Sequence, residues 1–179
     1  IKEFLPKCSE SEKSQIAKEF VKFKERCLVR LLGDMRSYNY VIIPTHDFDK
    51  IIYKIRAIDF DQQSFEGNLK VYNLQFLKEN FKIVDMVNRK LDNNSINQYK
   101  LEERSFMAKR MISSPRRASS LIECMKNDSI SFDNNIQLLK KQLIKYVGDV
   151  KFKECQNMGD ILETILIFVK RNYQDVLTK

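Results

Sequence analysis

The feature that most constrains this chain is a pair of short apolar runs that lie close together in the sequence. The runs are Tyr40–Pro44 and Ile51–Ile58, and the residues between them, 45–50, are mostly polar. In the second run, apolar and charged residues alternate, with Ile51, Tyr53, Ile55 and Ala57 on one side and Lys54 and Arg56 on the other. This is the period-two pattern of a half-buried strand. The sequence therefore predicts an antiparallel β-hairpin with a polar turn at 45–50.

Three polar residues are expected at the open end of this hairpin. Asn39 precedes the first run and Asp59 follows the second, so antiparallel pairing returns both to the same end. Continued alternation places Asp59 on the apolar face, where a bare carboxylate is costly without a cation or a donor. Asp34 lies five positions before Asn39, in a segment that can fold back on the same spot. We therefore expect two carboxylates and one amide to converge.

Oxygen ligands arranged in this way suit divalent-metal and phosphate chemistry. Magnesium takes one or two carboxylates and lets substrate phosphates complete its coordination shell. A further carboxylate can accept the proton of an attacking hydroxyl group. The competing interpretation is a plain hairpin whose Asp and Asn residues only cap and turn the chain.

The segment LGDMRSYN, the hairpin after it and the sequence IDFD resemble the catalytic core of the protein-kinase-like fold. Gly33-Asp34 and Ile58–Asp61 are more similar to small-molecule kinases of the aminoglycoside-phosphotransferase type than to protein kinases. The resemblance implies that Asp34 is the catalytic base and that Asn39 and Asp59 are magnesium ligands. It also implies Mg²⁺ and ATP as cofactors, a kinase-like C-terminal lobe as the fold, and an unknown phosphoacceptor as substrate.

The chain departs from the family pattern in three places. Leu32 stands where the family usually has a histidine, Asp61 replaces the glycine of protein kinases, and the interval from Asn39 to Asp59 is longer. A longer hairpin turn accounts for the interval. Leu32 favours a second interpretation, in which the chain is a non-catalytic kinase-like interaction module.

A nucleotide-covering N-terminal lobe is not expected in this sequence. Such a lobe needs a phosphate-covering loop, usually rich in glycine, and a lysine on a strand. The four glycines are far apart, and the residues before Asp34 have a helical pattern. We therefore expect one helical domain, 1–179, that is inactive alone. It is either a fragment of a longer kinase-like protein or a natural half-kinase, completed by an N-terminal lobe or a partner protein.

Composition and charge limit the remaining classes of function. The longest apolar run, Ile165–Val169, is too short to span a membrane, and four scattered cysteines with one histidine disfavour a zinc site. Free thiols of this kind indicate a reducing cytoplasm. The net charge of +8 favours anionic partners without choosing among them.

A third interpretation is an unrelated basic helical domain that binds nucleic acid or an acidic protein. It would require the Lys and Arg side chains to share one face. Aromatic residues interleaved with Lys and Arg on strands, which are typical of single-strand binders, are not seen in the sequence. Nucleic acid is therefore the less favoured partner.

Helical periodicity accounts for the rest of the chain. Helices are expected from 9–12 to 32, and at 73–91, 96–113, 115–125, 132–147 and 161–177. A residue within 9–12 caps the first, Asn73 the second and Asp160 the last, and Gly148 ends the fifth. With the hairpin, these helices predict an α+β fold that is mostly α, with one β-hairpin and about six helices.

Overall fold

The computed structural model describes residues 3–48 and 50–177, with side chains of residue 50 and of residues 174–177 left out. That part of the chain forms six α-helices and one two-stranded antiparallel hairpin, which confirms the mostly helical α+β class. The elements are α1 (Glu10–Val29), β1 (Tyr40–Asp47), β2 (Lys50–Ala57), α2 (Phe81–Lys90), α3 (Asn93–Ser113), α4 (Pro115–Lys126), α5 (Asp133–Val147) and α6 (Met158–Leu177). Short 3₁₀ turns lie at Leu5–Lys7, Leu69–Tyr72, Leu74–Phe76, Lys78–Asn80 and Val150–Glu154.

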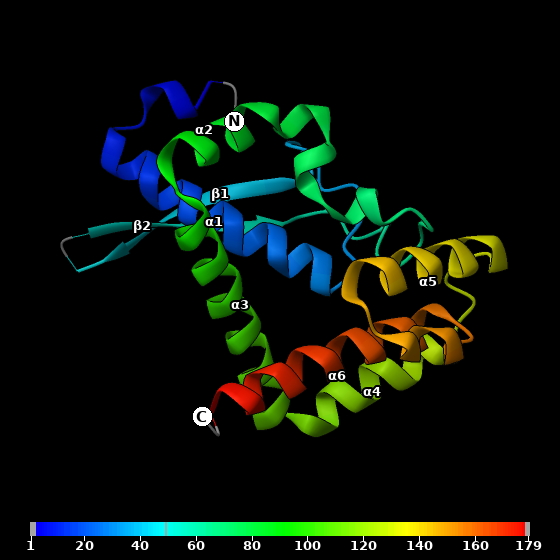
Figure 1. Cartoon of the computed structure of the whole chain (residues 1–179). Coiled ribbons are helices and arrows are strands. Elements are labelled where there is room, and N and C mark those ends of the chain that lie inside the picture. Colours follow the sequence, from blue (N-terminus) through cyan, green and yellow to red (C-terminus); the bar gives the residue numbers. More distant parts are fainter. Residues whose placement is uncertain (1–2, 49, 178–179) are drawn as a thin grey trace.

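Helix α1 runs through the middle of the molecule and takes part in both hydrophobic clusters (Figure 1). Its first turn carries a capping box, since Glu12 N donates to Ser9 Oγ over 3.3 Å and Ser9 N to Glu12 Oε2 over 2.7 Å. Phe20 and Phe23 pack with the hairpin and α2, whereas Val29 packs with α5 and α6. The helix ends at Val29, so its predicted extension to residue 32 is wrong.

The predicted hairpin is confirmed, and its strands are longer than expected. The register runs from Tyr40 opposite Ala57 to Asp47 opposite Lys50. The predicted turn at 45–50 is therefore largely strand, because cross-strand pairing satisfies the backbone of these polar residues as well. Phe48 beside the tip has φ 50°, a left-handed conformation. The side chain of Ile55 is buried and Lys54 and Arg56 are exposed, as the alternation predicted.

The predicted helix over 73–91 is wrong in its first half. Successive 3₁₀ turns occupy Leu69–Asn80, and α2 begins only at Phe81. The reason lies in Asn80, whose side chain is fully buried. It donates from Nδ2 to Met35 O over 2.9 Å and to Leu74 O over 3.1 Å, and its Oδ1 accepts from Tyr40 Oη over 3.1 Å. A buried amide needs such partners, and the segment bends to supply them.

Helices α1 and α3 cross through charged side chains. Glu25 and Glu103 are buried, whereas Phe106, which the helical spacing of 96–113 predicts to face inward, is 49% exposed. Arg26 Nε lies 2.9 Å from Glu103 Oε1, and Arg104 Nε lies 2.5 Å from Glu25 Oε1. Buried carboxylates are tolerated here because each has an arginine partner.

The C-terminal helices follow the predicted order with one shifted boundary. Gly148 ends α5 with φ 79°, the left-handed conformation that favours glycine. Helix α6 begins at Met158, and its first turn is capped by Asn157, whose Oδ1 accepts from Asp160 N over 2.9 Å. The prediction that Asp160 caps this helix is therefore wrong; its carboxylate accepts instead from Gln156 N over 2.8 Å. Among the described residues, no helix is both long and apolar enough to cross a bilayer.

Candidate functional site

Two loops are tied together at the open end of the hairpin. On one side, Ile58 N donates to Asn39 O over 3.0 Å. On the other side, Ser64 N donates to Leu31 O over 2.8 Å, and Leu32 pairs with Gln63 in an antiparallel bridge. The segments 32–39 and 58–63, which we call the paired loops, are thus joined at both ends. Asp34 lies on the first segment, and Asp59 and Asp61 lie on the second.

The paired loops approach so closely at Gly33 that a side chain would not fit there. A Cβ atom at this position would lie 2.7 Å from Gln62 O and 3.3 Å from the ring of Tyr72. The first of these is a backbone atom, so no side-chain rotation would relieve the contact. The close approach of the two loops therefore requires glycine at position 33.

Asn39 and Asp34 are in direct contact. Asn39 Nδ2 donates to Asp34 O over 2.8 Å and lies 3.3 Å from Asp34 Oδ2. Asn39 is almost fully buried. Because Nδ2 is engaged by Asp34, the amide has a fixed orientation that leaves Oδ1 for another partner, and no hydrogen bond to Oδ1 occurs within the described residues.

Asp34 is also paired with Arg36, a residue that the sequence reasoning missed. Arg36 Nε lies 2.7 Å from Asp34 Oδ1, and its Nη1 donates to Tyr38 Oη over 3.1 Å and lies 3.6 Å from Glu79 Oε1. Asp34 itself has φ 52°, a conformation uncommon outside glycine and often found at functional sites. The only signal in the sequence was a basic residue two positions after Asp34.

A second missed residue is Asp61, which interacts with Asp59. Asp61 N donates to Asp59 Oδ1 over 3.2 Å. A side-chain hydrogen bond with Asp59 raises the pKa of Asp61, burial raises it further, and the negative charges of Asp59 and Asp34 act in the same direction. The paired loops therefore bring three carboxyl groups close enough to affect one another. Such a concentration of negative charge favours a bound cation.

The donor set fits magnesium better than a metal held by the protein alone. In the part of the chain that the structure describes, no three His, Cys, Asp or Glu side chains are arranged to bind an ion by themselves. Oxygen donors from Asn39, Asp59 and Asp61 are nevertheless the type that magnesium prefers when phosphate oxygens complete its shell.

Exposed apolar side chains surround these polar groups. Tyr38 and Ile58 are 58% and 57% exposed, and Phe60 is also well exposed. Tyr38 precedes Asn39, and Ile58 precedes Asp59, so the apolar groups belong to the same paired loops. Apolar surface next to a polar centre is typical of a site covered by a ligand or by another protein surface.

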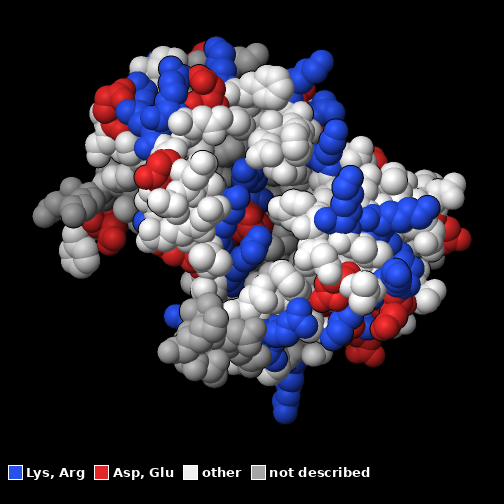
Figure 2. All heavy atoms as spheres, in the orientation of Figure 1, with Lys and Arg blue, Asp and Glu red and all other residues white. Residues whose placement is uncertain are grey.

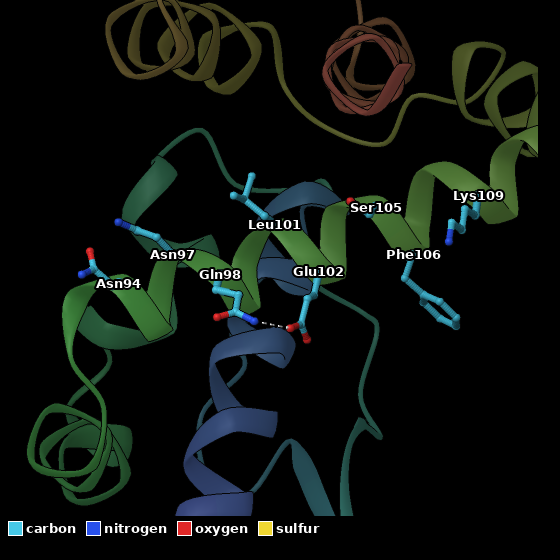
Figure 3. A pocket seen from close by; sticks show the side chains of 8 residues that line it. All are labelled: Asn94, Asn97, Gln98, Leu101, Glu102, Ser105, Phe106 and Lys109. Carbon is cyan, nitrogen blue, oxygen red and sulfur yellow. Dashed lines mark hydrogen bonds between the residues drawn. The ribbon is translucent and has the colours of Figure 1, made fainter. Parts of the chain in front are cut away.

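A separate shallow hollow of about 640 Å³ lies along α3 (Figure 3). It is lined largely by amide and hydroxyl side chains, with Leu101 and Phe106 as its apolar members. Gln98 Nε2 donates to Glu102 Oε1 over 3.1 Å, and Lys22 Nζ lies 2.6 Å from Glu102 Oε2. The carboxylate of Glu102 is the only one that lines this hollow, and both of its oxygens already have partners. We therefore take the paired loops as the candidate site.

Comparison of the chain with protein-family models, with curated proteins and with solved structures gives no match. The interpretation of the site therefore depends on its own geometry. That geometry places Asp34 beside Asn39 and joins the segment of Asp59 to Asn39 through Ile58.

Proposed function

We propose that this chain is the C-terminal lobe of a kinase-like phosphotransferase that uses ATP and magnesium. Asp34 is the catalytic base, and Asn39 and Asp59 are the magnesium ligands. The observation that supports this proposal best is the pair of joined loops, which holds the three residues at one end of the hairpin. The partners are a nucleotide, a hydroxyl-bearing phosphoacceptor and a nucleotide-covering lobe. The proposed location is the cytoplasm, where ATP is available and the four free thiols would stay reduced.

Asp34 is held in an orientation suited to accepting a proton. Its main-chain oxygen accepts from Asn39, and its carboxylate lies against the Arg36 guanidinium. The remaining N–H groups of Arg36 are suited to a phosphate oxygen, because a guanidinium binds such oxygens with directed hydrogen bonds.

Asn39, Asp59 and Asp61 supply the oxygen atoms for magnesium in this proposal. Asn39 would use Oδ1, since Nδ2 donates to Asp34 O. Asp61, whose pKa is raised by its hydrogen bond with Asp59, would bind the cation as the carboxylate and release any proton that it holds. A bound magnesium ion would neutralise charge on the transferred phosphate. The exposed Tyr38, Ile58 and Phe60 would then lie beneath the nucleotide or the second lobe.

One observation favours a non-catalytic kinase-like interaction module as the second candidate. Both carboxylate oxygens of Asp34 are already engaged, Oδ1 by Arg36 over 2.7 Å and Oδ2 by Asn39 over 3.3 Å. A basic nucleic-acid-binding domain has less support, because acidic side chains are interspersed among the Lys and Arg side chains on the face shown in Figure 2.

The metal part of the proposal can be tested on this chain alone. Mn²⁺, which replaces Mg²⁺ and is visible by electron paramagnetic resonance, is titrated into the protein with and without ATP. We expect ATP to strengthen Mn²⁺ binding only modestly while the nucleotide-covering lobe is missing. Asp59→Ala should weaken the binding about tenfold, whereas Asp47→Ala at the tip of the hairpin should leave it unchanged.

The catalytic part is tested by assaying phosphoryl transfer in a protein that supplies the second lobe. Asp59→Ala should abolish transfer, and Asp34→Ala should reduce it about 10²–10⁴-fold. Asn39→Ala should be milder, and Lys54→Ala on the other face of β2 should be tolerated. Retention of full activity by folded Asp34→Ala and Asp59→Ala variants would reject catalysis. Activity lost with no change in Mn²⁺ binding would reject the assignment of Asp59 as a metal ligand.

A further inference from the structure

A groove of about 890 Å³ lies between β2 and α1 on one side and α3, α4 and α6 on the other. None of Asp34, Asn39 and Asp59 lines it, although Gln63 at the end of the second paired loop does, so the groove borders the paired loops without containing the proposed site residues. Its volume lies within the range of small-molecule sites, about 300–1,000 Å³. An inference about this groove therefore does not rest on the proposed phosphotransferase.

The acidic side chains of the groove are already neutralised. Three carboxylates line it, and each forms an ion pair inside it. Lys22 Nζ lies 2.6 Å from Glu102 Oε2, and Arg26 lies 3.2 Å from Glu19 Oε1 and 2.9 Å from Glu103 Oε1. These pairs involve two of the six cationic side chains that line the groove.

The remaining four cations, Arg30, Lys54, Arg56 and Arg110, have no carboxylate partner within the described residues. Arg30 has a lowered pKa, because it is partly desolvated by burial and because the positive charges of Arg26 and Arg110 are near. Arg30 follows the C-terminal end of α1, where the helix dipole favours a positive charge. Lys54, Arg56 and Arg110 belong to other elements, so this dipole does not account for them. An anion in the groove would relieve this repulsion.

The side of the groove formed by α3, α4 and α6 carries most of its apolar residues, together with the cation Arg110. Met107, Met111, Leu162 and Leu166 line it, together with Phe106 and Leu121. Figure 3 shows the ring of Phe106 projecting away from the axis of α3, and Arg110 Cζ lies 4.3 Å from the centre of that ring. Methionine side chains adapt to ligands of different shape. Cationic and apolar side chains thus line the same space.

The edge of β2 is blocked at Ile55 against an added peptide strand. Arg26 Nη1 donates to Ile55 O over 3.2 Å, and Ile55 N donates to Glu19 Oε1 over 3.4 Å. Both outward backbone groups of Ile55 are therefore engaged by side chains of α1. Strand addition needs these groups to be free, so a ligand recognised by side chains fits the groove better than an extended peptide does.

We propose that this groove binds a small organic anion with an apolar body, of the alkyl phosphate or acyl phosphate class. The phosphate group contacts Arg30, Arg56 and Arg110, because guanidinium groups bind phosphate oxygens in pairs. The apolar body lies against Phe106, Met107 and Leu166. The cationic side chains and the apolar surface of the groove specify the two parts of the ligand.

Isothermal titration calorimetry on the whole chain tests this with three ligands. Octyl phosphate has both parts, inorganic phosphate has only the anionic group, and octyl glucoside has only the apolar chain. We expect octyl phosphate to bind at least about tenfold more tightly than either of the others, because both sets of side chains contribute. Arg30→Gln, Arg110→Gln and Phe106→Ala should each weaken its binding about tenfold.

Two control variants separate the groove from other surfaces. Lys141→Gln removes an exposed cation from α5 outside the groove and should leave octyl phosphate binding unchanged. Asp59→Ala should also leave it unchanged, so that a failure of the phosphotransferase proposal remains distinct from a failure here.

Equal binding of octyl phosphate and inorganic phosphate would overturn the proposal. So would unchanged binding in the folded Arg30→Gln and Phe106→Ala variants, and binding only of a polyanion such as polyglutamate would reassign the groove to an acidic peptide.

Discussion

The side-chain amide of Asn80 donates to the main-chain oxygen of Met35 over 2.9 Å, although the two residues are 45 positions apart in the sequence. The same side chain accepts from Tyr40 Oη over 3.1 Å. Met35 follows Asp34, and Tyr40 follows Asn39, so Asn80 holds the first of the paired loops in its middle and just after its end. This buried amide therefore positions the candidate site without belonging to it.

Replacement of Asn80 by Ala should destabilise the protein by about 3 kcal/mol, because a buried hydroxyl and two carbonyl groups lose their partner. Urea denaturation measures this loss. Asn88→Ala on the exposed side of α2 is the matched control and should change the free energy of unfolding by less than about 0.5 kcal/mol. A loss at Asn80 no larger than the control would mean that water replaces the amide.

Two glycine substitutions should have different consequences. Gly148→Ala meets no atom within 4 Å and should cost roughly 1 kcal/mol, from its positive φ alone. Gly33→Ala should cost more, since its Cβ would lie 2.7 Å from the backbone oxygen of Gln62. It should also separate the paired loops and weaken Mn²⁺ binding, whereas Gly148→Ala should not. Similar Mn²⁺ titrations for the two variants would contradict the close approach described here.

The free energy of unfolding should depend on pH through the titration of Asp61. Its pKa is raised in the folded state, first by the hydrogen bond with Asp59. The folded protein therefore holds this proton more tightly than the unfolded chain does, so the group stabilises the fold at low pH. The contribution is lost as the pH rises through the raised pKa.

Asp61→Asn should remove this dependence, so it should gain stability relative to the parent as the pH rises from about 4 towards 7. Denaturation midpoints measured across that range give the comparison. Added Mg²⁺ should reduce the difference at neutral pH, because a cation relieves the repulsion in the parent. Parallel pH profiles for the two proteins would show that Asp59 and Asp61 do not interact as described.

The crossing of α1 and α3 should be sensitive to loss of one charge. Glu103→Ala leaves the guanidinium of Arg26 without its nearest partner and should destabilise by about 3 kcal/mol. Arg89→Ala removes an exposed ion pair with Asp85 within α2 and should cost less than about 0.5 kcal/mol. A double-mutant cycle between Arg26→Ala and Glu103→Ala measures the coupling. Additive effects in that cycle would argue against a direct interaction.

Several features of this fold could be predicted because their causes are local. The alternation in 51–58 specified the hairpin, since one face of a strand repeats every two residues. Ser9 and Glu12 formed the capping box of α1, and Gly148 ended α5, each through contacts within a few positions. The hairpin also brings Asn39 close to Ile58, the neighbour of Asp59, because antiparallel strands return the chain to its starting point.

The amino-acid sequence alone therefore determined the hairpin, most of the helices and the candidate residues Asp34, Asn39 and Asp59. Only the tertiary structure decided how Asp34 is held, because its loop depends on Gln63 and on Asn80, which are distant in the chain. The same is true of the buried charge of Glu103 and of its pairing with Arg26. A buried polar group must find a partner wherever the fold supplies one, and that partner is set by packing between distant segments, which leaves no periodic signal in the sequence.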